Sequence, residues 1–117
     1  ADPAWMGERV AATRLVPGER PSVRIWHRDA SGWATQATLP DVTVPSPWWD
    51  GTRWRLVAQD MRPEGAGGIV ESVEEAPGQW SAPRPVDGVP RTPRCESPVA
   101  TRWRGRYVLL CSERLEP

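Results

Sequence analysis

The stretch Cys95–Glu113, CESPVATRWRGRYVLLCSE, sets the pattern for the rest of the chain. It predicts a short strand that begins at a proline, a turn at Arg104–Gly105, and an apolar strand that leads away. Weaker versions of this layout occur at Ala1–Leu15 (ADPAWMGERVAATRL) and at Pro45–Asp60 (PSPWWDGTRWRLVAQD). The prolines that match in the three copies are Pro3, Pro47 and Pro98.

A second pair of matching segments follows the first two copies. Ser22–Trp33 (SVRIWHRDASGW) resembles Gly67–Trp80 (GGIVESVEEAPGQW). Repeats of about 40–50 residues, each with about four short strands, are typical of β-propeller blades. We therefore predict a single all-β domain over residues 1–117, with about two and a half propeller-like blades of short antiparallel strands. The predicted repeats are 1–44, 45–94 and 95–117, of which the third is incomplete.

The composition supports strands over helices. The 14 prolines and 10 glycines interrupt the chain too often for long helices. Apolar residues alternate over short distances, as at Val23 and Ile25, or form brief runs such as Tyr107–Cys111. Stretches of this length are typical of strands.

Charge and motif content exclude several classes of partner. The formal net charge is zero, so a general attraction to nucleic acid is not expected. No apolar run approaches the ~20 residues that a membrane helix needs, so no membrane partner is expected. No glycine-rich phosphate loop precedes a helix, which argues against a nucleotide cofactor. The single histidine, His27, has no second ligand at a recognisable spacing, so no metal site is predicted.

The incomplete third repeat leaves the architecture open at one end. A closed propeller has about four to eight blades, so this chain cannot close a ring alone. Three alternatives follow: the chain is a fragment of a longer protein, it completes a ring as a homo-oligomer, or it folds as a compact sandwich or barrel.

The two cysteines, Cys95 and Cys111, lie on opposite sides of the predicted Arg104–Gly105 turn. Cys95 is further from the turn than Cys111, so a bulge or a wider loop is needed to bring them within bridging distance. One alternative is a disulfide, which implies an oxidising compartment. The other is a pair of buried thiols that act as small hydrophobic residues.

The recurring pattern of an acidic residue and proline, followed by glycine, an aromatic residue, an apolar strand and serine, resembles a known family. It is similar to the five-bladed β-propeller glycosidases of the arabinanase, xylosidase and invertase type. The matching residues are Asp2 in ADP, Glu96 in ESP and the hairpin Trp103–Ser112 (WRGRYVLLCS). The resemblance implies that Glu96 is the general acid and Asp2 the base or nucleophile of a glycoside hydrolase. The third acidic residue of the family corresponds here to Ser46, in PSPWW.

The tryptophans suggest a place for a sugar. Trp48 and Trp49 are adjacent, so on a strand they face opposite ways, and one ring can stack on a sugar while the other packs between blades. Arg53 is predicted to line the same opening. Trp33 and Trp80 occupy equivalent repeat positions and are expected to pack between blades.

The sequence thus predicts a secreted, glycoside hydrolase-like protein that acts on or binds polysaccharide. The alternatives are a non-catalytic, lectin-like carbohydrate-binding module that oligomerises, and a structural or interaction domain. Glu96 in its ESP context favours the hydrolase, whereas Ser46 in place of a carboxylate favours the binding module.

Overall fold

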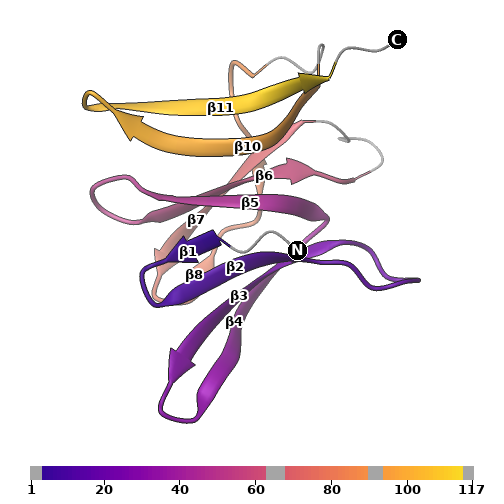
Figure 1. Cartoon of the computed structure of the whole chain (residues 1–117), viewed down its shortest axis with the longest axis vertical. Coiled ribbons are helices and arrows are strands. Elements are labelled where there is room, and N and C mark those ends of the chain that lie inside the picture. The colour runs from indigo at the N-terminus through magenta and orange to yellow at the C-terminus, as the bar shows by residue number, and fades with distance from the viewer. Residues whose placement is uncertain (1–3, 63–67, 90–93, 115–117) are drawn as a thin grey trace.

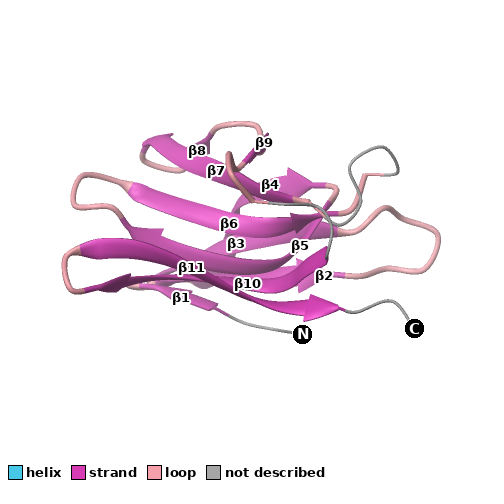
Figure 2. Cartoon of the chain, turned by 90° about the horizontal axis from the view of Figure 1, so that it is seen from above, coloured by secondary structure: helices cyan, strands magenta, loops and turns pink. Residues whose placement is uncertain are grey.

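The chain is entirely β in the part that the structure describes. A computed structural model describes residues 4–62, 68–89 and 94–114. These residues contain eleven strands, all paired antiparallel, and no helix (Figure 2). The predicted all-β class is confirmed, and none of the three sheets closes on itself within the described residues.

The first sheet is a four-stranded meander in chain order. Its strands are β1 (Ala4–Met6), β2 (Arg9–Arg14), β3 (Ser22–Asp29) and β4 (Gly32–Pro40). Strands β1 and β2 are joined by a tight turn that contains Gly7, whose φ of 60° suits a residue without Cβ. The chain leaves this sheet at Pro40 and enters the next at Val42.

The second sheet repeats the meander with a divided last strand. It contains β5 (Val42–Trp49), β6 (Trp54–Asp60) and β7 (Ile69–Ala76). The last strand of this sheet is split in two, because β8 (Gln79–Trp80) and β9 (Arg84–Pro85) each pair separately with β7.

The third sheet is a hairpin of β10 (Arg94–Trp103) and β11 (Arg106–Arg114). The predicted turn at Arg104–Gly105 is present. Both of its residues have positive φ, 48° at Arg104 and 75° at Gly105, as two-residue hairpin turns with a favourable twist require.

Matching bulges define how the second and third sheets correspond. In β5 the register shifts next to Val44, which has a φ of 55° and precedes Pro45. In β10 it shifts next to Ser97, which has a φ of 51° and precedes Pro98. The structural match is therefore between Pro45 and Pro98. The predicted match of Pro47 with Pro98, in which each proline follows a serine, is therefore wrong by two residues, because the matching bulges precede Pro45 and Pro98.

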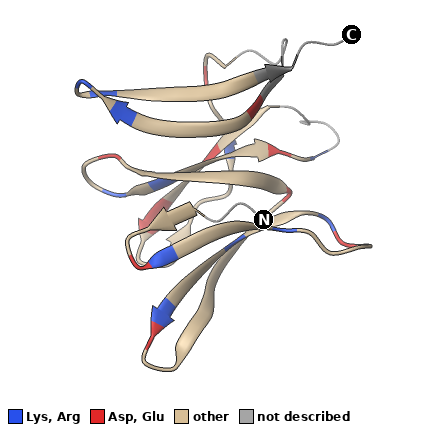
Figure 3. Ribbon diagram, in the orientation of Figure 1, with Lys and Arg blue, Asp and Glu red and all other residues tan. Residues whose placement is uncertain are grey.

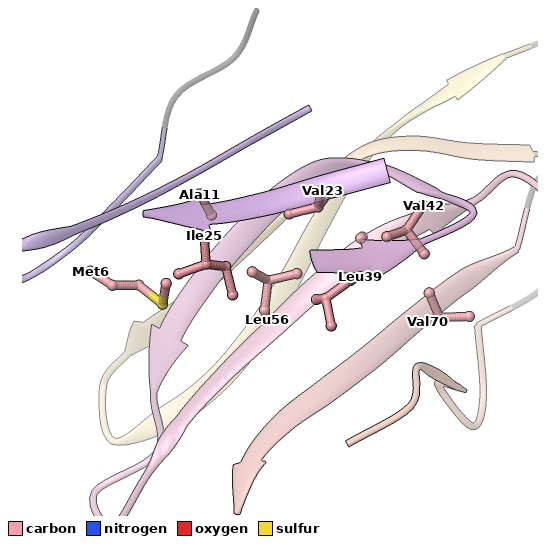
Figure 4. Packing of buried hydrophobic residues seen from close by; sticks show 9 residues of the cluster. Met6, Ala11, Val23, Ile25, Leu39, Val42, Leu56 and Val70 are labelled. Carbon is pink, nitrogen blue, oxygen red and sulfur yellow. The ribbon is translucent and has the colours of Figure 1, made fainter. Parts of the chain in front are cut away.

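The second sheet lies between the other two (Figure 1). One of its faces packs on the first sheet and forms the main core, in which Leu56 is only 1% exposed. Figure 4 shows these apolar side chains in the space between the two sheets. The core contains Met6, Ala11, Val23, Ile25, Leu39, Val42, Leu56, Ala58 and Val70.

The opposite face of the second sheet packs on the hairpin. Val57 and Ile69 are buried there, and Ala100 and Leu109 from the hairpin pack against them. Successive residues of a strand point to opposite faces, so Leu56 belongs to the main core and Val57 to the core beneath the hairpin.

The chain as a whole is flat, with principal extents of 50 × 43 × 21 Å.

The two tryptophans predicted to pack between repeats differ in burial. Trp80 packs against the main core. Trp33 is 48% exposed and meets only the edge of the Trp5 ring, with centroids 6.1 Å apart, among the aromatic contacts of the described residues. The prediction for Trp33 is wrong because its side chain points away from the second sheet. Trp33 pairs with Arg28, whose neighbour His27 pairs with Arg9 on the face that meets the second sheet, and no other sheet of the described residues covers the outer face (Figure 1).

Candidate ligand-binding groove

A groove of about 350 Å³ opens on the second sheet beside the hairpin. It is lined by Arg55, Glu71, Val73, Glu75, Ser81, Arg84, Pro85, Val86 and Asp87. An apolar recess of about 130 Å³ adjoins it and shares Glu71 and Val86. The recess is completed by Trp48, Val57, Ala100, Tyr107, Val108 and Leu109.

Strand alternation places the groove residues on one face of the sheet. Arg55 pairs with Val73, and Val57 pairs with Glu71, so these four side chains share a face. Glu75 lies two residues after Val73 on the same strand and therefore joins them.

Arg55 is the centre of the polar network in the groove. Its Nε donates to Asp50 Oδ2 at 2.6 Å, and its Nη1 donates to Glu71 Oε1 at 2.8 Å. The second carboxylate oxygen of Glu71 accepts the indole N–H of Trp48 at 3.2 Å. One guanidinium thus bridges the β5–β6 turn and strand β7.

The network holds both ends of the Asp50–Arg55 pair in their charged forms. The hydrogen bond from Arg55 is the main reason that the pKa of Asp50 falls to about 2, and the backbone N–H of Arg53 adds to it. The hydrogen bond to Asp50 likewise raises the pKa of Arg55. Both groups are therefore fixed charges over the whole physiological pH range.

Aromatic rings connect the network to the hairpin. The rings of Trp48 and Tyr107 lie with centroids 4.3 Å apart, and the Arg55 guanidinium lies 5.8 Å from the centroid of the Trp48 ring. Because Trp48 is half-buried between these neighbours, Tyr107, at 44% exposed, is the more accessible ring.

The groove carries charges of both signs. Its lining contains two arginines, Arg55 and Arg84, and three carboxylates, Glu71, Glu75 and Asp87. Acidic and basic segments are also interspersed along the ribbon as a whole (Figure 3). A ligand in the groove therefore meets donors and acceptors side by side.

An arginine equivalent to Arg55 occupies the junction between the first and second sheets. Arg9 stands two residues before Ala11 in β2, as Arg55 stands two residues before Val57 in β6, and Ala11 and Val57 pair at matching positions with the preceding strands. The Arg9 guanidinium donates to both carboxylate oxygens of Glu74 and to Gln36 Oε1.

The partners of Arg9 come largely from the next sheet. Glu74 belongs to β7, and Trp80, whose ring centroid lies 5.9 Å from the Arg9 guanidinium, belongs to β8. Among the described residues, the sheet that follows the second one has two strands, so it supplies no counterparts to β7 and β8 there. Arg55 pairs instead with carboxylates of its own sheet, and the groove stays open.

Glu96, the general acid implied by the glycosidase resemblance, does not line the groove. Glu96 is half-buried on β10 and pairs with Ser112 of β11. Asp2 lies outside the described residues. The Ser46 hydroxyl accepts the backbone N–H of Ala100 at 3.1 Å, which joins the second sheet to the hairpin. The catalytic roles of Glu96 and Asp2 stay predictions.

The three residues predicted to bind sugar do not meet in one site. Trp48 borders the apolar recess, whereas Trp49 is 48% exposed and packs edge-on against Trp54, at 5.7 Å between centroids. Trp49 is thus on the opposite face of β5. Arg53 is exposed beside the β5–β6 turn, and its backbone N–H donates to Asp50.

Cys111 is disulfide-bonded and exposed on β11. It lies across from the β10 bulge, since Leu110 pairs with Val99 and Ser112 with Glu96. The side chain of Cys95 lies outside the described residues, so the Cys95–Cys111 pairing stays a prediction.

The described residues contain no cluster of three or more histidine, cysteine, aspartate or glutamate side chains arranged to hold a metal ion. In the same part of the chain, no helix has the length and apolar character needed to cross a membrane.

Sequence reasoning did not select most of the groove. The segment IVESVEEA places Glu71, Val73 and Glu75 at every second position, a signal of one mixed polar face. Tyr107 and Arg84 carry no comparable local signal. The place of Tyr107 in the recess depends on how β11 packs on the second sheet, and that of Arg84 in the groove on how β9 pairs with β7.

Comparison with protein families, with curated proteins and with solved structures found no match to this chain.

Proposed function

We propose that the protein is a non-catalytic carbohydrate-binding module and that a neutral saccharide binds in the groove on the second sheet and in the adjoining apolar recess, which the hairpin helps to line. The observation that carries this proposal is the network of Arg55, Glu71 and Trp48 beside the accessible ring of Tyr107. It combines rigid donors and acceptors with an apolar aromatic surface.

The balance of charges favours a neutral, hydroxyl-rich ligand. Sugar hydroxyls both donate and accept, so they pair with guanidinium N–H groups and with carboxylate oxygens at the same time. An anion would be repelled by Glu71, Glu75 and Asp87, and a cation by Arg55 and Arg84. A neutral polyol avoids both penalties.

The groove is better suited to binding than to hydrolysis. A glycosidase needs one protonated carboxyl group to act as general acid. Arg55 lowers the pKa of Asp50 to about 2. Asp50 is therefore not a proton donor near neutral pH, and the carboxylate of Glu71 is engaged by both Arg55 and the indole N–H of Trp48.

We further propose that the three sheets are successive propeller-type blades. The proline bulge recurs in β5 and β10, and the second sheet packs face to face on both neighbours. The disulfide at Cys111 fits the secreted location expected from the sequence, since disulfides persist in oxidising compartments.

The proposal is tested by screening the purified chain on an array of neutral and charged glycans and measuring the strongest binder by titration calorimetry. We expect Arg84→Gln to weaken binding about tenfold, because a lost charge-assisted hydrogen bond is worth about 1.5 kcal/mol or more. Arg84 is exposed, so the fold should be retained.

Arg53→Gln is the matched control, because Arg53 is equally exposed but does not line the groove. Equal affinity of this variant and the wild type is expected. A loss of affinity in Arg53→Gln with none in Arg84→Gln would move the site away from the groove, and binding to no neutral glycan would refute the function.

A further inference from the structure

The two junctions between sheets within the chain use the same positions. At the first, Ala11 of β2 faces the next sheet and shares a core with Leu56 of β6. At the second, Val57 of β6 faces the next sheet and packs with Leu109 of β11. We call a side chain forward-facing if it points toward the next sheet along the chain, and backward-facing if it points toward the preceding sheet. At each junction, one residue of the second strand is forward-facing, and the residue of the next sheet that shares its core lies one position earlier in the equivalent strand.

A hydrogen bond recurs at both junctions. The backbone N–H of Val44, the bulged residue of β5, donates to Thr13 Oγ1 of the preceding sheet at 2.9 Å. The backbone N–H of Ser97, the bulged residue of β10, donates to Gln59 Oε1 at 3.4 Å. Thr13 and Gln59 each stand two residues after the forward-facing residue of their strand.

The outer face of the hairpin carries the same forward-facing set a third time. Leu110 pairs with Val99 of β10, as Ala11 pairs with the first strand of its sheet and Val57 with the first strand of its own. Ser112 follows Leu110 by two residues. The apolar members of this face are uncovered: Val99 is 50% exposed, Leu110 55% and Trp103 59%. The Ser112 hydroxyl is exposed at the position of Thr13 and Gln59.

The outer face of the first sheet carries the matching backward-facing set. Val10 holds the position that Leu56 and Leu109 hold in their sheets, one residue before the forward-facing one. Trp5, which pairs with Val10, is 65% exposed. Exposed tryptophan and aliphatic side chains gathered on one face mark an interaction surface.

We propose that the outer face of the hairpin docks on the outer face of the first sheet of a second copy of this chain. The docking repeats the contact that already joins the three sheets within one chain. Such an interface joins two different surfaces, so it either closes a ring or continues as a filament. Two copies bring six sheets, within the four to eight of closed propellers.

The inference does not rest on saccharide binding, and its test is independent of any ligand. The full chain is examined by size-exclusion chromatography with light scattering over a range of concentrations. We expect a species of twice the chain mass of 13.1 kDa. Leu110→Asp and Trp5→Glu, each placing a charge on one of the two faces, should both give monomers with an unchanged circular dichroism spectrum.

Leu15→Asp is the control, because Leu15 is 74% exposed in the loop between β2 and β3 and belongs to neither face. This variant should remain dimeric. Mixing Leu110→Asp with Trp5→Glu provides the decisive step. Each variant keeps one intact face, so the mixture should form a one-to-one dimer although neither variant does so alone.

Three outcomes would overturn the inference. A wild-type chain that stays monomeric at all concentrations removes the second copy. A dimer that persists in both variants places the contact on another surface, such as the unpaired edge of β11. Failure of the mixed variants to associate shows that the two faces do not meet each other.

Discussion

Asp50→Asn isolates the charge that organises the β5–β6 turn. Asp50 Oδ1 accepts the backbone N–H groups of Thr52 and Arg53, each at 2.8 Å, and Oδ2 accepts Arg55 Nε at 2.6 Å. Asparagine retains an oxygen for the two turn amides but places an NH₂ group where the arginine donates. The substitution therefore removes the ion pair and leaves the turn geometry.

The stability lost with the ion pair is worked out from the pKa of Asp50, which falls from 3.8 to about 2 on folding. A shift of one pKa unit corresponds to about 1.4 kcal/mol, so the ionised form stabilises the fold by at most about 2.4 kcal/mol. Solvent screens a pair at the surface, and Asp50 and Arg55 are 14% and 32% exposed. We expect a loss of about 1–2 kcal/mol, or a fall in Tm of about 5–10 °C.

The direction in which the stability difference changes with pH distinguishes loss of the ion pair from other effects of the substitution. Because folding lowers the pKa of Asp50, the stabilisation is fully present above pH 3.8 and is lost as the pH falls through about 2. Urea unfolding of wild type and variant at pH 6, 4, 3 and 2 should give free-energy curves that converge at the acidic end.

Asp29→Asn serves as the control, since Asp29 also accepts a turn amide, the N–H of Ser31, at an exposed position. Its effect should stay below about 0.5 kcal/mol. A difference between wild type and Asp50→Asn that is the same at pH 6 and pH 2 would refute the reasoning.

Two further predictions concern the junction between the first and second sheets. Leu56→Ala should lower the free energy of unfolding by about 2–5 kcal/mol, because Leu56 is 1% exposed in the core, whereas Leu15→Ala, at a 74% exposed position, should change it little; urea titration measures both. Glu74→Gln should lower the free energy of unfolding by about 3 kcal/mol at pH 7, since it leaves Arg9, which is 16% exposed, without its carboxylate partner. This loss should shrink as the pH falls below 4.5, because the hydrogen bonds from Arg9 and Gly78 lower the pKa of Glu74 despite its burial. An equal loss in the exposed neighbour Glu75→Gln would contradict this.

The strands were predictable because their signals are local. Alternation at Val23 and Ile25, and the Arg104–Gly105 turn, depend on residues a few positions apart. The bulges were not predictable in the same way. Val44 and Ser97 adopt positive φ without being glycine, so nothing in their residue type indicates the bulges that make Pro45, and not Pro47, the counterpart of Pro98.

The groove was less predictable than the strands because it depends on the packing of distant segments. Arg55 pairs with Trp48 across β5 and β6, and the two residues lie within one short stretch of sequence. Tyr107 lies some 50 residues further on, and only the packing of the hairpin on the second sheet brings it to Trp48. Trp49, next in sequence, is excluded from the same site by strand alternation alone.

The two-stranded form of the hairpin accounts for the open groove. At the first junction, Glu74 and Trp80 from the third and fourth strands of the next sheet cover Arg9. At the second, the two-stranded hairpin covers Val57 but does not reach across to Val73 and Glu75. A sheet with only its first two strands thus provides enough apolar contact to hold the junction and leaves the polar half of its neighbour exposed. Docking of a second copy on the far side of the hairpin would leave this groove accessible, so association and saccharide binding are compatible in one assembly.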